Sequence, residues 1–334
     1  MKDNSITLTQ QQLAELIAGL KPPADVLKGD TMPYGSYLLK WFFNHTEWTP
    51  KTKETYKGMI DNHIIPRFGD VMMSDITFED LEDFMHEKGE TLSPATMEKM
   101  QSCIIKASFR DAMRQHYIKE NPAEYLRPLR VHNKTKRALK DEELNDLIRV
   151  SHSHRLGYTV PLLLGTGMRR AEMLALTWED VDFATCTIYV NKDYVSTAHE
   201  SLIRETKNEG SVRAVSFPSY LVETLRHIKE RDNHSFVVSQ AKQDKRIEPH
   251  NYNRLFRSWC KKAALVGVSP HSMRVMYCTI ANELGVSLDT IRRQVGHSSE
   301  RMLITHYLKQ RTNQQQKDAA RLMSDFMIHR LIVA

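Results

Sequence analysis

The amino-acid sequence predicts an α+β protein, in which an all-α domain precedes a mainly helical domain with a small antiparallel sheet. Apolar residues between positions 33 and 124 recur at the spacing of amphipathic helices. Between 185 and 217, short runs rich in β-branched residues or alternating in polarity are typical of strands. The helical spacing returns from Leu221 onward. Helices that surround a small segregated sheet in this way indicate the α+β class.

The first domain is predicted to contain four helices. Thr49 and Ser93 each precede a proline, and a hydroxyl N-cap followed by proline is a typical helix start. Asn121 and the proline after it end the last helix. The predicted helices cover residues 37–48, 51–68, 77–88 and 93–118. A short helix at 9–18 precedes them, so we assign 1–32 to an N-terminal helix and linker and 33–126 to the helical core domain.

A basic linker, residues 127–137, joins the two predicted domains. From Tyr125 to Lys140 the chain carries six Lys or Arg residues and no acid. The chain as a whole has a formal net charge of +6. Local positive charge of this kind favours a polyanion such as DNA, although a solvent-exposed linker without a ligand has the same composition.

The second domain is predicted to span residues 138–334. Residues 208–210 are expected to form the turn of a hairpin whose strands are 201–206 and 212–217, with a further strand at 185–191. The predicted helices of this domain cover residues 141–151, 157–165, 220–230, 251–265, 270–284, 288–295, 300–310 and 318–329. The last of them has an apolar stripe that suits either this chain's own core or a neighbouring protomer.

Several classes of protein are disfavoured by the sequence. The four cysteines form no CxxC pair, and the acids and histidines show no HExxH spacing, so we expect no zinc site, other metal or cofactor. No apolar run approaches the roughly 20 residues of a membrane helix, and the N-terminus lacks the apolar segment of a signal peptide. We therefore expect a cytoplasmic protein without membrane contact.

Four segments carry side chains suited to phosphate chemistry. Arg169 follows a Gly-Thr-Gly turn and lies three residues before Glu172, so the two share a helix face or form a structural ion pair. His271 and Arg274 lie one helical turn apart behind Ser269 and Pro270, and we expect both side chains to point the same way. The other candidates are Lys207 at the hairpin tip, His297 after a helix-ending glycine, and Tyr307. Taken singly, each has an ordinary structural explanation.

Taken in order, these segments resemble the tyrosine recombinases of the phage-integrase family. The resemblance covers about residues 33–330 and implies that family's fold. It implies that Arg169, Lys207, His271, Arg274, His297 and Tyr307 form the active site, with Glu172 supporting Arg169. Tyr307 lies one position later after His297 than is most common, and Val275 stands where many members have a second histidine. Arg170 competes with Arg169, but the TGxRxxE spacing selects Arg169.

These residue types suit the cutting and rejoining of DNA. Two arginines can hold the non-bridging oxygens of a phosphodiester and stabilise the charge of the transition state. In the role that the resemblance implies, Tyr307 attacks the phosphorus and holds the cut strand as a 3′-phosphotyrosine, and Lys207 protonates the leaving 5′ oxygen. The ester keeps the bond energy, so a second 5′ hydroxyl can reseal the strand without ATP or metal.

We therefore expect a site-specific recombinase, most simply the integrase of a phage or conjugative element, acting through a Holliday junction. The expected partners are double-stranded DNA with paired inverted half-sites, three further copies of this chain in a homo-tetramer, and an accessory excision factor. Two alternatives remain open at this point. One is a DNA-binding clamp that does not recombine, and the other is a host chromosome-dimer resolvase or relaxing topoisomerase of similar chemistry.

Overall fold

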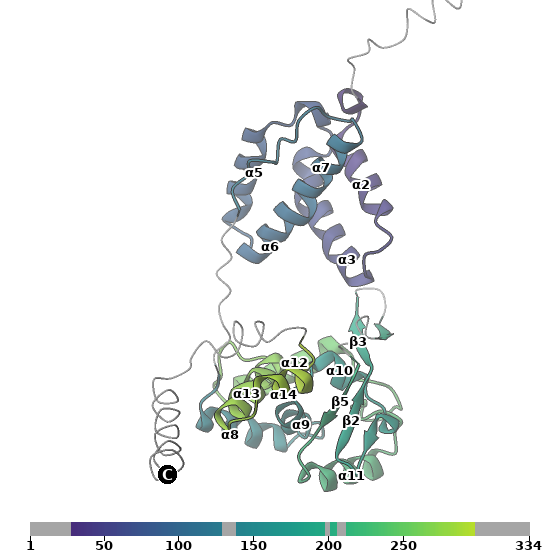
Figure 1. The fold of residues 1–334 in the computed structure, drawn as a ribbon, viewed down its shortest axis with the longest axis vertical. Helices are drawn as coiled ribbons and strands as arrows, with labels where there is room; N and C mark the ends of the chain where they lie inside the picture. The colour runs from purple at the N-terminus through teal and green to yellow at the C-terminus, as the bar shows by residue number, and fades with distance from the viewer. Residues whose placement is uncertain (1–27, 129–137, 198–200, 206–211, 298–334) are drawn as a thin grey trace, which may run out of the picture. The chain divides into compact units, whose positions relative to one another are not determined.

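The computed structural model describes residues 28–128, 138–197, 201–205 and 212–297. The chain divides into two compact units, residues 1–133 and 134–334, and each is described by itself (Figure 1). Among the described residues, no helix is both long enough and apolar enough to cross a membrane.

The regular secondary structure in the described part of unit 1 is helical, apart from one isolated β-bridge between Pro33 and Met72. Four helical stretches follow one another, and two of them contain an internal π-helical segment. They are α2 (Tyr34–Asn44); α3 (Pro50–Met59) continued by a π segment (Ile60–Ile64) and α4 (Ile65–Phe68); α5 (Phe78–Gly89); and α6 (Pro94–Lys99) continued by a π segment (Met100–Ile105) and α7 (Lys106–Arg114). Two short 3₁₀ turns, Lys28–Thr31 and Met73–Asp75, complete the unit.

The helix starts in unit 1 lie at the predicted caps. The Oγ1 atom of Thr49 accepts a hydrogen bond from the backbone N–H of Thr52 at 3.2 Å, and Ser93 caps α6 in the same way. The last helix is shorter than predicted, because α7 ends at Arg114 rather than near Asn121. His116, two residues beyond, has a φ of 58°, a left-handed conformation that a helix cannot continue through.

Unit 2 combines helices with short strands. Its helices are α8 (Asp141–His152), α9 (Thr159–Thr166), α10 (Arg170–Ala175), α11 (Leu221–Asp232), α12 (Pro249–Lys262), α13 (Pro270–Glu283) and α14 (Leu288–Val295), with a 3₁₀ turn at Trp178–Asp180. Its strands are β1 (Val181–Asp182), β2 (Thr187–Val190), β3 (Lys192–Ser196), β4 (Ser201–Glu205) and β5 (Arg213–Ser216). This arrangement confirms the predicted α+β class.

The strands of unit 2 form two antiparallel sheets in the described part of the chain. One has the order β1-β2-β5 and the other pairs β3 with β4. The predicted hairpin between residues 201–206 and 212–217 is therefore wrong, because β4 and β5 belong to different sheets. The unpredicted strand β3 pairs with β4, and β5 pairs with β2, where Ile188 lies opposite Val215. Both of these side chains are fully buried, so burying them together fixes the register of β5 on β2.

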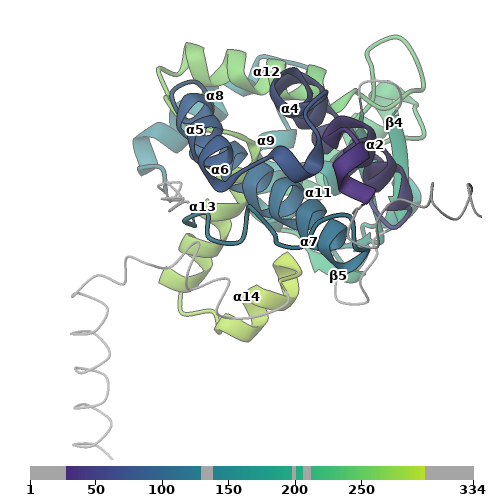
Figure 2. The same ribbon diagram turned by 90° about the horizontal axis from the view of Figure 1, so that it is seen from above.

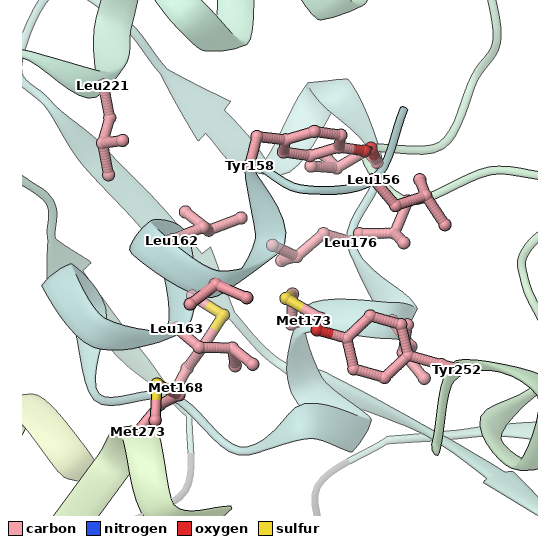
Figure 3. Packing of buried hydrophobic residues seen from close by; sticks show 14 of the residues in the cluster. Leu156, Tyr158, Leu162, Leu163, Met168, Met173, Leu176, Leu221, Tyr252 and Met273 are labelled. Atoms are coloured by element: carbon pink, nitrogen blue, oxygen red, sulfur yellow. The ribbon is translucent and has the colours of Figure 1, made fainter. Parts of the chain in front are cut away.

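Helix α9 packs against α13 in unit 2. Figure 2 labels both helices in the view from above. Val160, Leu162 and Leu163 are fully buried, as expected of a helix that is apolar on every side. The same core cluster contains Met168 and Met273, both labelled in Figure 3. Each of these methionines directly precedes an arginine of the predicted site. Packing of the core thus anchors the backbone that carries Arg169 and Arg274.

Candidate functional site

The turn between α9 and α10 brings two predicted segments together. Gly167 ends α9 with a φ of 63°, and a Cβ added there would lie 2.6 Å from the ring of Tyr277 on α13. Glycine is required because it tolerates both the left-handed φ and the close approach of the ring. The carbonyl oxygen of Gly167 accepts a hydrogen bond from Nη1 of Arg274 at 2.9 Å. The predicted Gly-Thr-Gly turn therefore binds the second arginine of the site directly.

Arg169 is the N-cap of α10 and is bonded to Glu172 in two ways. Its backbone N–H donates to Oε2 of Glu172 at 2.7 Å, and its Nη1 donates to Oε1 at 2.8 Å. Its Nη2 also donates to the carbonyl oxygen of Gly296 at 3.2 Å. The Arg169 side chain is 42% exposed although that of Glu172 is only 2% exposed. The buried Glu172 carboxylate thus fixes Arg169, while part of the Arg169 side chain remains accessible to a ligand.

Arg213 on β5 is a buried component of the site that the sequence reasoning missed. Its Nη1 and Nη2 donate to the two carboxylate oxygens of Glu172 at 3.1 and 2.9 Å. Its Nε donates to the backbone carbonyl of Gln294 at 2.8 Å. Arg213 therefore connects the segment around Arg169 to the end of α14. The strand that contains Arg213 was predicted. The sequence offered no sign that Arg213 belongs to the site beyond its being a basic residue in that strand.

The residues before His297 are held by two hydrogen bonds between Gln294 and Ser216 and by the close packing of Gly296 on Arg213. Gln294 Nε2 donates to the carbonyl oxygen of Ser216 at 2.6 Å and Oε1 accepts from the Ser216 N–H at 3.2 Å. Gly296 ends α14 with a φ of 69°, and a Cβ there would lie 2.9 to 3.0 Å from the guanidinium of Arg213. His297 follows directly and is 7% exposed. The helix-ending glycine is thus needed both for the turn and for the passage of Arg213 beneath it.

His271 and Arg274 lie one helical turn apart at the start of α13, as predicted. Ser269 and Ser272 form a capping box, and Pro270 occupies the first helical position. The two side chains differ sharply in exposure, since Arg274 is 1% exposed and His271 is on the surface. The two side chains therefore lie in different environments.

His271 and Arg169 line one groove in unit 2. The groove has a volume of about 1110 Å³, and α12 and the segment 264–268 form its far wall. Its basic lining residues are Arg169, Arg170, Arg257, Lys261 and His271. Among the described residues that line it there is no aspartate or glutamate. The groove therefore has the electrostatic character of a site for an anion.

The charge of Glu172 is stabilised by its neighbours. Burial alone would raise the pKa of this carboxyl, but the hydrogen bonds and charge of Arg213, together with the charge of Arg169, lower it below 4.5. Two tyrosines of the same unit behave differently. Burial raises the pKa of both Tyr158 and Tyr252, whose hydroxyl groups donate to Val237 and Thr159. These phenols are held protonated in the core and are unsuited to attack a phosphate.

Five of the seven predicted site residues lie in the described part of the chain. Arg169 and Glu172 are bonded to each other, Arg274 joins them through the Gly167 turn, and His297 follows the Gly296 carbonyl that Arg169 binds. His271 shares the groove with Arg169. Lys207 and Tyr307 lie outside the described residues.

Comparison with known proteins agrees with the arrangement of these segments. The model of the phage integrase family matches residues 137–314, and the model of the phage integrase N-terminal SAM-like domain matches 34–89. The ICEBs1 integrase of Bacillus subtilis is 26% identical over 289 residues, which cover 82% of this chain and 77% of the relative.

Solved structures show the same fold at lower identity. The Tn1549 transposon integrase in complex with a circular intermediate DNA matches with a TM-score of 0.76 and 20% identity, covering 87% of this chain and 99% of that one. A lambda integrase tetramer bound to a Holliday junction matches with a TM-score of 0.67 and 18% identity, covering 87% and 85%. Because the first family model covers more than half of the 334 residues, the chain belongs to the phage integrase family, the tyrosine recombinases that its motifs predicted.

Proposed function

We propose that this chain is a site-specific DNA recombinase of mobile-element type that cuts and rejoins double-stranded DNA through Tyr307. The observation that carries the proposal is the bonded set of Arg169, Glu172, Arg213 and Arg274 around the Gly167 turn, beside a groove whose described lining carries no acid. Such a set holds positive charge in a fixed orientation before the phosphate binds. Preorganised charge of this kind stabilises the transition state without any cost of reorganisation.

In the proposed reaction, Arg169 and Arg274 hold the non-bridging oxygens of the scissile phosphate. The phenolic oxygen of Tyr307 attacks phosphorus, and the bond from phosphorus to the 5′ oxygen breaks. His271 takes the phenolic proton, Lys207 gives a proton to the departing 5′ oxygen, and His297 donates a hydrogen bond to the phosphate. Attack of another 5′ hydroxyl on the phosphotyrosine reverses the step and reseals DNA without a cofactor. Paired exchanges of this kind pass through a Holliday junction.

The assembly proposed for this reaction has four protomers on two DNA sites. Residues 33–126 bind the core DNA, residues 138–334 carry the chemistry, and the basic segment 127–137 joins them. The tetramer is proposed because the lambda integrase that shares this fold has been solved as a tetramer on a Holliday junction. We also propose that the protein acts in the cytoplasm on the DNA of its host, and that an accessory factor directs excision.

A covalent trap tests this function. The bound sequence is first selected from a random duplex pool, where the proposal expects two inverted half-sites around a short spacer. A duplex is then made with that sequence and with a nick beside the cleavage position. Cleavage of this duplex frees a short fragment that carries the 5′ hydroxyl, and once the fragment diffuses away the strand cannot be resealed and stays on the protein. The wild-type chain should give an adduct that survives denaturant, with or without chelator.

Tyr307→Phe should give no adduct, and Tyr277→Phe is the matched control. Tyr277 lies in unit 2 against Gly167, and burial raises the pKa of its phenol. An adduct from Tyr307→Phe would refute the assigned nucleophile. Duplex binding by the wild-type chain without any adduct would instead favour a DNA-binding clamp.

A further inference from the structure

Arg170 lies beside Arg169 in the wall of the groove but has different partners. Its Nη1 donates to Oδ1 of Asn253 on α12 at 2.6 Å. Its Nε atom is buried, and no acceptor for it lies among the described residues. In the same part of the chain no carboxylate forms an ion pair with Arg170, whereas Arg169 and Arg213 share Glu172. Arg170 is thus a half-buried cation held in place by a neutral amide.

This environment is unfavourable for an arginine without an anion. Burial lowers the pKa of Arg170 because the charged guanidinium loses hydration. A guanidinium does not lose its proton in a protein, so the unfavourable desolvation persists until a counter-charge binds. An anion that enters the groove would supply that counter-charge. Asn253 meanwhile orients the guanidinium without neutralising it.

Helix α12 presents two more cations on the same side. Asn253, Arg257 and Lys261 recur every four residues, so they share one face of the helix, and all three line the groove with Arg170. Arg257 and Lys261 are exposed. Residues 249–262 contain no aspartate or glutamate, so no acid on the helix competes for these cations. Three positive charges along one wall match a chain of phosphates better than a single small anion.

We propose that Arg170, positioned by Asn253 and aided by Arg257 and Lys261, binds a non-reacting phosphate of the DNA strand that passes Arg169. This subsite rests on the proposed function only in taking DNA as the ligand. It separates the two neighbouring arginines by role, because Arg169 contacts the reacting phosphate and Arg170 contacts another along the backbone. Contacts of this type fix the register of the strand and read no sequence.

The test is the salt dependence of DNA binding by the full chain carrying Tyr307→Phe, measured on a short duplex of arbitrary sequence. Each phosphate contact contributes a slope of about 0.9 in a plot of log affinity against log salt. Arg170→Gln should make the slope shallower by about that amount, and Arg170→Lys should restore most of it because the charge returns. Arg226→Gln is the matched control, since Arg226 is exposed on α11, at the far end of the unit from α12 (Figure 1).

The proposal would be overturned if Arg170→Gln left the salt slope unchanged, or if it reduced the slope only as much as Arg226→Gln does. If Arg170→Gln fails to fold, Arg257→Gln gives the answer, because that side chain is on the surface and its loss should also remove about one contact. An unchanged slope there would equally overturn the proposal. The measurement does not depend on DNA cleavage. A negative result would therefore not count against the chemistry proposed for Tyr307, and a failed covalent trap would not count against the Arg170 subsite.

Discussion

Replacing Arg213 with glutamine would remove the buried cation that joins Glu172 to the end of α14. The change eliminates two bonds to the carboxylate, at 3.1 and 2.9 Å, and one to the Gln294 carbonyl, at 2.8 Å. The paired side chains are 7% and 2% exposed, so solvent screens their interaction little. Breaking such a buried pair typically costs about 3–5 kcal/mol. Because Glu172 keeps its bonds to Arg169, we expect a loss of about 3 kcal/mol, the lower end of that range.

Hydrogen exchange measured by mass spectrometry suits this prediction, because it reports on each unit of the chain separately. A loss of about 3 kcal/mol should speed exchange of the most protected amides of α9 and α13 by roughly a hundredfold. Amides of unit 1 should be unaffected. The matched control is Arg149→Gln, whose side chain is 76% exposed in its pair with Asp146 and should change stability by less than about 0.5 kcal/mol.

A double-mutant cycle completes the test. Glu172→Gln alone should also destabilise unit 2, since it leaves Arg213 buried without its counter-charge. Combining it with Arg213→Gln removes both charges, so the double variant should lose clearly less than the sum of the single losses. Additive losses, or an Arg213→Gln variant no less protected than Arg149→Gln, would refute the assignment of Arg213 as the link between the two segments.

Two further predictions concern stability. In thermal unfolding, Gly167→Ala should destabilise unit 2 by about 1–3 kcal/mol more than the control Gly267→Ala. Both glycines have a positive φ, but only a Cβ added at Gly167 would lie within 3 Å of other side chains, the ring of Tyr277 and a methyl of Val295. Equal losses of stability would contradict the packing argument. The pKa of Glu172 is lowered by folding, so its contribution is present above pH 4.5 and lost as pH falls through the folded pKa. The stability difference between the wild-type chain and Glu172→Gln should therefore shrink on acidification, and a difference that stayed constant would exclude this linkage.

Local signals in the sequence predicted the helices of the described residues well, whereas the helices predicted at 9–18, 300–310 and 318–329 lie outside them. The caps at Thr49, Ser93 and Ser269 depend on bonds that span three residues, so the pattern and the structure agree. The end of α14 was also predicted from a local signal, because Gly296 adopts the left-handed conformation that ends a helix.

Non-local contacts explain what the sequence did not predict. The pairing of β5 with β2 depends on where Ile188 and Val215 are buried, and adjacency along the chain wrongly favoured β4 as the partner of β5. Arg213 was missed for the same reason. Its role comes from Glu172, 41 residues away, and nothing in its own strand distinguishes it from a surface arginine.

Identification of the modified residue in the trapped adduct is the most direct test of the account. After nuclease digestion and trypsin cleavage, Tyr307 falls in the peptide 302–309, where it is the only tyrosine and is preceded by Thr305 and His306. Fragmentation of that peptide should place the nucleotide phosphate on Tyr307. A phosphate on Thr305, on His306 or on a tyrosine of another peptide would contradict the proposed chemistry.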